Sequence, residues 1–221
     1  MMKTVVAVHT AMAMVEPTKN LFKEHLPGVR LINIVDDSLI QDVIRDGGVT
    51  PAVEKRMKSY YQAAVDAGAD VIFNTCSSVG EIAIAERKHL PVPLVKIDDS
   101  MARNAVISYQ HIGVMATLPT TLDPTKKLIN RIAEEVSRNI TVVEGLVDGA
   151  FQALMEGNTD EHDRRVVNKA NTIAGMVDVI LLAQGSMARV QDTIVAQTGK
   201  PVLTSPLLGV LEVKSVLENL K

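Results

Sequence analysis

Two segments decide how this chain folds: Asp70–Ser78, which reads DVIFNTCSS, and Asp178–Ser186, which reads DVILLAQGS. They align without a gap at a separation of 108 residues, and Pro93–Val95 and Pro201–Leu203 repeat that separation. A second pair of stretches, at 10–21 and 117–128, matches at a separation of 107 residues. Two matches in the same order at nearly equal separations predict an internal duplication, with the boundary near residue 99.

Short β-branched runs alternate with amphipathic segments of helical length along both copies. Several runs are apolar throughout, which is typical of parallel strands covered on both faces. The alternation predicts an α/β fold with two pseudo-symmetric, Rossmann- or flavodoxin-like halves, a parallel sheet in each, and a ligand cleft between them. We expect strands near 4–9, 29–35, 70–75, 93–97, 111–116, 140–147, 177–183 and 201–204, and helices near 17–26, 51–67, 79–89, 99–108, 124–137, 148–156, 161–175, 187–198 and 207–219.

Three local signals predict where helices start. Glu16-Pro17 and Asp123-Pro124 each place an acidic residue before a proline suited to the first helical position. Ser78–Glu81 has the pattern of a capping box. The last expected helix has no strand after it and is predicted to return to the first half. We therefore expect one domain from 1–98 plus 205–221, and a second from 99–204.

The composition of this 221-residue chain excludes several classes of function. The net charge is −3 without any basic run, so we expect neither nucleic acid nor a membrane as a partner. Neither a membrane-spanning run nor a secretory signal is recognised. Phosphate-binding glycine loops and metal-ligand spacings are absent, which predicts that no metal and no cofactor are needed. A single cysteine, Cys76, fits the reduced cytoplasm.

Cys76 is the principal candidate for chemistry. It ends an apolar strand and directly precedes an expected helix start, a position predicted to lower the pKa of its thiol. A thiolate there can act as a base or a nucleophile. The alternative is a small buried hydrophobic residue. The polar flanks Asn74-Thr75 and Ser77-Ser78 favour the functional interpretation.

Other polar residues follow strand ends, where ligands bind in open parallel sheets. Hydroxyl, amide and backbone donors at such turns suit a carboxylate, although simple capping explains them too. The candidate ligand-binding residues are Thr10, Asn74, Thr75, Ser77, Ser78, Thr117, Thr121, Gln184, Gly185 and Ser186.

Histidines and charge pairs are weaker candidates. His9, at the end of the first strand, is interpreted either as a catalytic proton relay or as a structural residue. His162 is expected in the first turn of an exposed helix. The acidic pairs Asp36-Asp37 and Asp98-Asp99 are interpreted as solvated or capping residues.

The duplicated halves, the Asn74–Ser78 turn and the stretch from Thr117 to Thr125 resemble the aspartate/glutamate racemase superfamily, which includes hydantoin racemases, maleate isomerases and arylmalonate decarboxylases. The resemblance implies a cofactor-independent enzyme, usually a homodimer or larger oligomer. It also implies that two cysteines exchange a proton at the substrate α-carbon while Ser/Thr turns hold the carboxylate. Here Gln184 stands at the second cysteine position, and His9-Thr10 replaces the usual Asp-Ser.

Three functions follow from this pattern. The first is a racemase or isomerase acting at the α-carbon of a small carboxylate or hydantoin-type substrate, with Cys76 as the catalytic thiol. The second is a lyase resembling arylmalonate decarboxylase, whose single thiol lies in the other half. The third is a non-catalytic carboxylate-binding protein with the same fold.

Overall fold

The computed structural model describes residues 2–220 and divides them into two compact units. Unit 1 runs to Asp99 and resumes at Pro206, and unit 2 is Ser100–Ser205. These boundaries lie within a residue or two of the expected ones.

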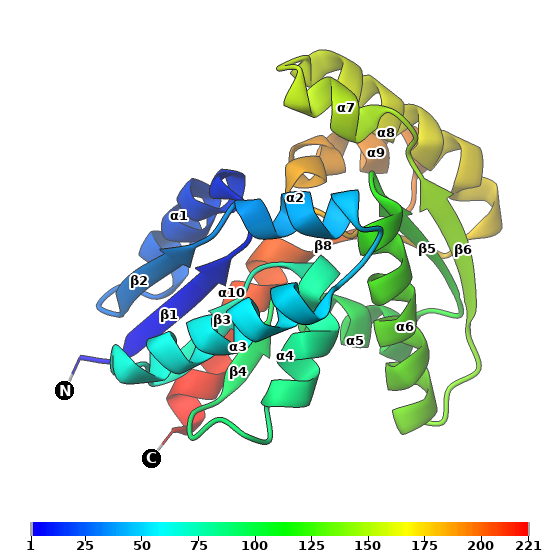
Figure 1. Cartoon of the computed structure of the whole chain (residues 1–221). Coiled ribbons are helices and arrows are strands. Elements are labelled where there is room, and N and C mark those ends of the chain that lie inside the picture. The colour runs from blue at the N-terminus through cyan, green and yellow to red at the C-terminus, as the bar shows by residue number, and fades with distance from the viewer. Residues whose placement is uncertain (1, 221) are drawn as a thin grey trace. The chain divides into compact units, whose positions relative to one another are not determined.

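Unit 1 is built on a four-stranded parallel sheet in the order β2-β1-β3-β4 (Figure 1). In its register, Val8 of β1 lies opposite Asn74 of β3, which lies opposite Lys96 of β4. The strands are β1 (Thr4–His9), β2 (Arg30–Val35), β3 (Val71–Asn74) and β4 (Leu94–Lys96). The helices are α1 (Val15–His25), α2 (Ser38–Arg45), α3 (Pro51–Asp66), α4 (Gly80–Glu86) and α10 (Ser205–Asn219), with 3₁₀ turns η1 (Met12–Met14) and η2 (Ser77–Val79).

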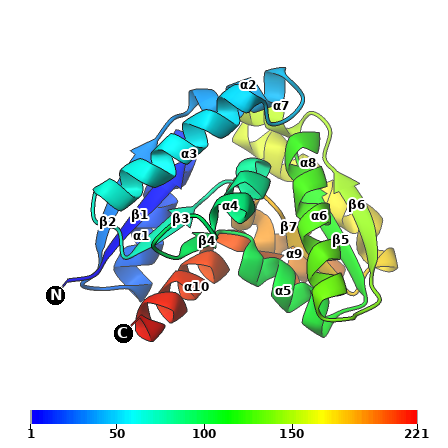
Figure 2. The ribbon, with the colours of Figure 1, turned by 60° about the horizontal axis from the view of Figure 1, so that its bottom comes forward.

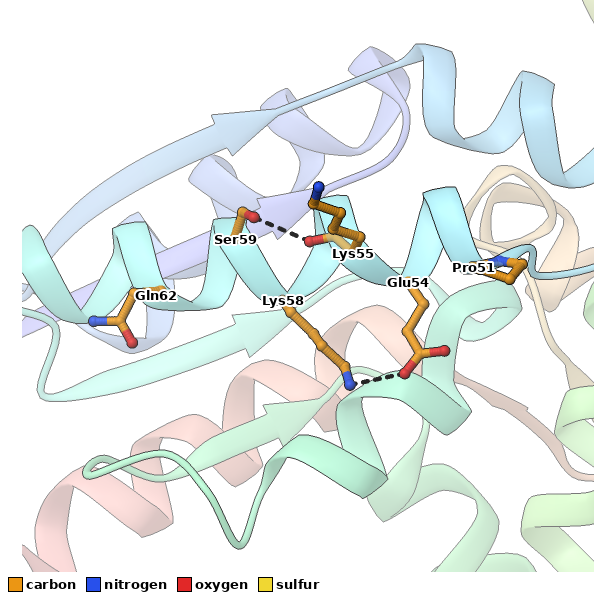
Figure 3. A pocket seen from close by; sticks show the side chains of 6 residues that line it. All are labelled: Pro51, Glu54, Lys55, Lys58, Ser59 and Gln62. Carbon is orange, nitrogen blue, oxygen red and sulfur yellow. Dashed lines mark hydrogen bonds and ion pairs between the residues drawn. The ribbon is translucent and has the colours of Figure 1, made fainter.

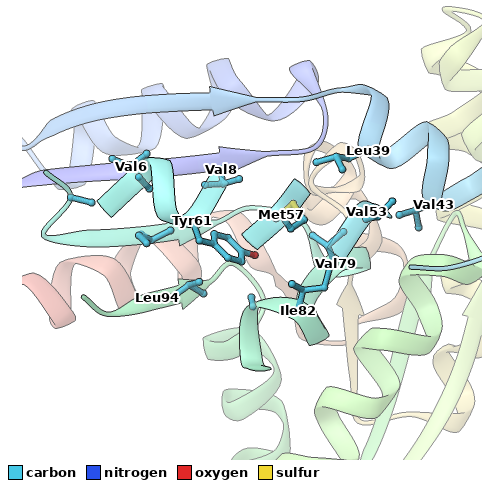
Figure 4. Packing of buried hydrophobic residues seen from close by; sticks show 14 residues of the cluster. Val6, Val8, Leu39, Val43, Val53, Met57, Tyr61, Val79, Ile82 and Leu94 are labelled. Atoms are coloured by element: carbon cyan, nitrogen blue, oxygen red, sulfur yellow. The ribbon is translucent and has the colours of Figure 1, made fainter. Parts of the chain in front are cut away.

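Alternation of side chains along the strands gives this sheet two buried faces. One face carries Val6, Val8 and Ile72 and packs against α2, α3 and α4. Figure 4 shows Met57 and Tyr61 of α3 within this cluster. The other face carries Val5, Ala7, Val71 and Phe73 and packs against α1 and α10, which Figure 2 shows beside the sheet. Both faces are apolar, which explains the continuously hydrophobic strands.

Unit 2 repeats this architecture with a parallel sheet in the order β6-β5-β7-β8. α8 and α9 pack on the face that carries Met115, Ile180 and Leu182. Its strands are β5 (His111–Ala116), β6 (Thr141–Leu146), β7 (Val179–Leu182) and β8 (Val202–Thr204). Its helices are α5 (Asp99–Ser108), α6 (Pro119–Glu135), α7 (Ala150–Met155), α8 (Thr159–Ile173) and α9 (Gln191–Thr198), with 3₁₀ segments η3 (Ala174–Met176) and η4 (Gly185–Val190). No helix within residues 2–220 is both long and apolar enough to cross a membrane.

All eight predicted strands are present, but the three helix-start predictions were wrong. α1 begins at Val15, so Pro17 is its third residue, where a missing N–H costs no helical hydrogen bond. α6 begins at Pro119 and contains Pro124 in its second turn. Ser78 lies in η2, and α4 starts at Gly80 with Val79, not Ser78, as its N-cap residue. The helix α2 was not predicted.

Gly209 of α10 provides a test of the packing in unit 1. A Cβ at this residue would lie 2.7 Å from the carbonyl oxygen and 2.9 Å from the Cα of Ile97. Because these are backbone atoms, Gly209→Ala is expected to lower the free energy of unfolding by about 1–3 kcal/mol, although alanine is the better helix former. Urea denaturation measures this change. The control Gly48→Ala, at a glycine with no neighbour within 4 Å and no positive φ, should leave stability unchanged.

Candidate functional site

Cys76 follows β3 at the carboxyl edge of the sheet in unit 1 and is half-buried. Its thiol has hydrogen-bond partners in the Thr10 hydroxyl, the Ser78 side chain and the backbone N–H groups of Ser78 and Val79. Burial raises the pKa of the Cys76 thiol, and these hydrogen bonds only partly offset that rise. The expected lowering of this pKa was therefore wrong. The long-helix dipole that it assumed is missing, since α4 starts only at Gly80 and has 7 residues.

His9 lies at the same edge, fully buried at the end of β1. Its Nε2 is 2.9 Å from Asn33 Oδ1, and its Nδ1 is 2.9 Å from Thr75 Oγ1. An amide oxygen can only accept, so Nε2 donates to Asn33. The Thr75 hydroxyl lies within hydrogen-bond distance of both His9 Nδ1 and the Val8 carbonyl, to which it donates at 3.1 Å. Burial lowers the pKa of the His9 imidazole, despite the hydrogen bond to Asn33. His9 therefore fixes Thr75, and direct proton transfer would first require one of these bonds to break.

Asn74 and Tyr61 fix the conformation of the Asn74–Ser78 turn. Asn74 accepts a hydrogen bond from the Tyr61 hydroxyl at 3.1 Å and donates one to the Cys76 carbonyl at 2.9 Å. The fully buried Tyr61 thereby fixes the backbone that carries the thiol. Ser77 is buried, and its hydroxyl makes no hydrogen bond to any residue that the structure describes. This hydroxyl is available to a ligand.

Unit 2 contains an equivalent pair of side chains. Thr117 follows β5 as Thr10 follows β1, and Gln184 follows β7 nearly as Cys76 follows β3. The Thr117 hydroxyl donates to Gln184 Oε1 at 2.8 Å, and the Thr117 backbone N–H donates to the same oxygen. The Thr10–Cys76 pair of unit 1 is thus repeated as Thr117–Gln184. The second repeat keeps the threonine and replaces the thiol by an amide whose NH₂ remains a donor.

The other predicted residues of unit 2 surround this pair in sequence. Gly185 and Ser186 open η4, directly after Gln184. Thr121 is buried in the first turn of α6. The neighbouring Thr120 has a buried hydroxyl oxygen with no hydrogen-bond partner among residues 2–220. The N-cap residue of α6, Leu118, offers no side-chain cap, but its carbonyl accepts from the N–H groups of Thr121 and Leu122, and Pro119 has no N–H to offer.

The structure corrects three interpretations of polar residues in part. His162 does lie in the first turn of its helix, and Asp36 does accept from the Ser38 N–H at the start of α2, as a capping residue would. His162 is fully buried. Asp98 is buried as well, in an ion pair with the buried Lys96, whose Nζ lies 3.3 Å from its carboxylate. Asp36, directly after β2, accepts hydrogen bonds from Ser38, Arg56 and Tyr60. Ser38 is only two residues away, whereas Arg56 and Tyr60 lie on α3, which no local sequence pattern links to Asp36.

Asp36 ties α2 and α3 to the carboxyl edge of the sheet. Burial raises its pKa, but the hydrogen bonds from Tyr60, Ser38 and Arg56 outweigh burial and hold the pKa below its usual value. The stabilisation is therefore present above the unfolded pKa of about 4 and is lost as the pH falls through the lower folded value. Asp36→Asn is expected to lower the free energy of unfolding by about 1–3 kcal/mol at pH 7, with the difference from wild type shrinking below pH 4.

Urea denaturation from pH 3 to pH 7 tests this expectation. The matched control is Asp46→Asn, because Asp46 pairs only with the adjacent Arg45 at the surface. That variant should be as stable as wild type at pH 7. Equal stability of Asp36→Asn and Asp46→Asn would contradict the role given to Asp36.

A hollow of about 450 Å³ lies on the outer side of α3 (Figure 3). Two of its three charged residues, Glu54 and Lys58, form an ion pair with one another at 2.8 Å. No residue of the Asn74–Ser78 turn lines it. We therefore place the candidate site at the strand ends and not in this hollow.

The carboxyl edges of the two sheets are thus alike. In each unit, the threonine after the first strand pairs through its hydroxyl with a side chain just past the third strand in chain order. This arrangement defines a duplicated α/β protein, and open parallel sheets generally bind ligands at such strand ends. The chain belongs to the Asp/Glu/hydantoin racemase family, whose model matches residues 4–213.

Solved structures share the fold at low sequence identity. A glutamate racemase, RacE1 from Bacillus anthracis, superposes with a TM-score of 0.75 at 12% identity, over 98% of this chain and 82% of that one. An allantoin racemase from Klebsiella pneumoniae gives 0.73 at 16% identity, over 98% and 88%. An arylmalonate decarboxylase gives 0.64 at 15% identity, over 98% and 93%. A sequence search among curated proteins finds no match.

Within residues 2–220, no three His, Cys, Asp or Glu side chains lie together in a way that could hold a metal ion.

Proposed function

We propose that the protein is a cofactor-independent racemase or related isomerase acting at the α-carbon of a small carboxylate or hydantoin-type substrate. Cys76 is its catalytic thiol. The observation that carries the proposal is the Cys76 environment: a half-buried thiol at a strand end, among donors from Thr10, Ser78 and Val79, in a chain of this family. Such donors stabilise a thiolate when it forms.

The proposed step is a proton transfer at carbon. The Cα–H bond breaks, its proton joins the Cys76 sulfur, and its electron pair moves into the adjacent carbonyl or carboxylate. The Ser77 hydroxyl, beside Cys76 in the same turn, is proposed to hold that group as its charge grows. Return of a proton to the carbon completes the exchange. Gln184 contributes a hydrogen bond only, because an amide does not titrate usefully.

A lyase is the second candidate, and the raised pKa of Cys76 favours it specifically. In that reaction the bond from Cα to a carboxylate breaks, carbon dioxide leaves, and the electron pair stays on the remaining carboxylate as an enediolate. The Cys76 thiol then donates its proton to the carbon. A thiol that is protonated at neutral pH is already in the form that this reaction needs.

Proton NMR in D₂O distinguishes these candidates. Amino acids, hydantoins, 2-hydroxy acids and malonates are incubated with the protein, and the α-hydrogen signal is followed. Loss of that signal without carbon dioxide release supports the isomerase, and carbon dioxide release supports the lyase. Binding without either change would instead indicate a non-catalytic carboxylate-binding protein. Chiral analysis of the exchanged product identifies racemisation. The homo-oligomer and the cytoplasmic location stay predictions.

A further inference from the structure

His162 in unit 2 is a buried polar residue with an unpaired ring nitrogen. Its side chain is fully buried, and its Nε2 has no hydrogen-bond partner among residues 2–220. An unpaired buried polar atom destabilises a fold. The helix α8 carries His162 as the first residue of its buried face, which continues with Val166, Ala170 and Ile173.

The first repeat shows which kind of residue packs at the position equivalent to His162. The helix α3 occupies the same place between the second and third strands, and its buried residues Val53, Met57, Tyr61 and Ala64 have the same spacing as those of α8. Each helix begins with a side-chain cap, from Thr50 and Asn158. By its place in the buried face, although one residue closer to its cap, Val53 corresponds to His162. An apolar residue satisfies this position in one repeat, so the imidazole of the other is unexplained by packing.

Hydrogen bonds orient the imidazole of His162. Its Nδ1 lies 2.8 Å from Asp163 Oδ1, and Arg189 Nε donates to both oxygens of Asp163 at 2.8 Å. The carboxylate can only accept, so Nδ1 carries a hydrogen, although Arg189 Nη2 also lies 3.2 Å from Nδ1. In a ring with one hydrogen, the lone pair then lies on Nε2. A carboxylate that orients an imidazole in this way leaves the second nitrogen as a directed acceptor.

His162 lies at the same sheet edge as the Thr117–Gln184 pair. Arg189, which holds Asp163, belongs to η4, and η4 directly follows Gln184. One turn after His162, Arg165 donates at 3.1 Å to the carbonyl of Asp148, two residues past β6. The start of α8 is therefore tied to the ends of β6 and β7, the two strands that flank β5.

We propose that His162 is a substrate-binding residue whose Nε2 accepts a hydrogen bond from an N–H or O–H donor of the ligand that Gln184 contacts. This proposal rests on the proposed function and narrows its substrate class. Preferred ligands carry a donor beside the α-carbon, as α-amino acids, 2-hydroxy acids and ureides do. A dicarboxylate without such a donor is a poor ligand.

The test compares wild type with His162→Val, the residue of the first repeat, and His162→Gln, whose amide oxygen can replace the acceptor. The probes are aspartate, malate and 2-methylsuccinate, which differ in carrying an amine, a hydroxyl or a methyl group. 5-Methylhydantoin and 1,3,5-trimethylhydantoin form a second matched set. Ligand-induced shifts in Tm measure binding, and α-hydrogen exchange in D₂O measures turnover.

Without ligand, His162→Val is expected to raise the Tm by about 2–4 °C, because it removes the unpaired nitrogen. It should weaken binding of the donor-bearing probes about tenfold and leave the methylated probes unchanged, with partial recovery in His162→Gln. Equal binding of donor-bearing probes by His162→Val and wild type overturns the proposal, as does wild type that binds none of them. Binding that weakens as expected without any exchange supports His162 and overturns the proposed function alone.

Discussion

Cys76→Ala is expected to lower the rate of α-hydrogen exchange by about 10²–10⁴-fold, the usual contribution of a positioned acid or base. The loss follows from removing the only cysteine sulfur in the chain. Because Cys76 is half-buried and alanine is smaller, the fold should tolerate the change. NMR in D₂O gives the rate, and thermal unfolding confirms that the variant is folded.

The matched variant Cys76→Ser separates chemistry from packing. Serine keeps the size of cysteine and the hydrogen bonds to Thr10 and Ser78, but its hydroxyl is far less acidic than a thiol. Serine should therefore be nearly as inactive as alanine. If Cys76 were only a packing residue, both variants would exchange the α-hydrogen at the wild-type rate, and the proposed function would fail.

The pH profile of the wild-type reaction identifies the form of Cys76 that reacts. Burial raises the pKa of this thiol above its ordinary value, so the thiol form dominates at pH 7. A base must be the thiolate, so an isomerase rate is expected to rise with pH from 7 to beyond 9. A lyase needs the thiol, so its rate would stay level over this range and fall only when the thiol ionises. A rate that neither rises with pH nor falls when the thiol ionises would contradict a catalytic thiol.

The strands could be predicted from sequence because each is a local pattern. Val71–Phe73 and Val179–Leu182 are buried on both sides, so their composition alone identifies them. The duplication is also visible in the sequence and places Thr10 and Thr117 at equivalent positions. α2 is different: it is a short helix of 8 residues, and its N-cap residue, Asp37, provides no side-chain cap.

The electrostatics of the site could not be predicted because they depend on contacts distant in sequence. The adjacency of Cys76 to a turn suggests a lowered pKa, but its burial depends on the packing of α3 and α4 on the sheet. The hydrogen bond between His9 and Asn33 joins residues that are 24 positions apart, and no local sequence pattern predicts that they meet. The apolar face of α8 was predicted as a helix, yet its periodicity does not show that His162 belongs to that face.

Gln184→Cys is expected to increase inversion at the α-carbon by about 10²-fold, because it places a titratable group where the amide now stands. The two repeats supply the reason. Thr10 gives its hydroxyl to the side chain at position 76, and Thr117 gives its hydroxyl to the side chain at position 184, so a thiol there meets the same donor. Gln184 is half-buried, so the smaller cysteine should leave the stability of unit 2 nearly unchanged.

The control for Gln184→Cys is Gln184→Ser, which fills similar space with a group that does not ionise. Chiral chromatography measures the inverted product, and NMR in D₂O measures total exchange. The ratio of inversion to exchange should rise in Gln184→Cys and not in Gln184→Ser, because a second thiol returns the proton in place of water. The gain should disappear in the double variant Cys76→Ala/Gln184→Cys. Equal ratios in the cysteine and serine variants would mean that position 184 does not reach the reacting carbon, and that its pairing with Thr117 serves only the fold of unit 2.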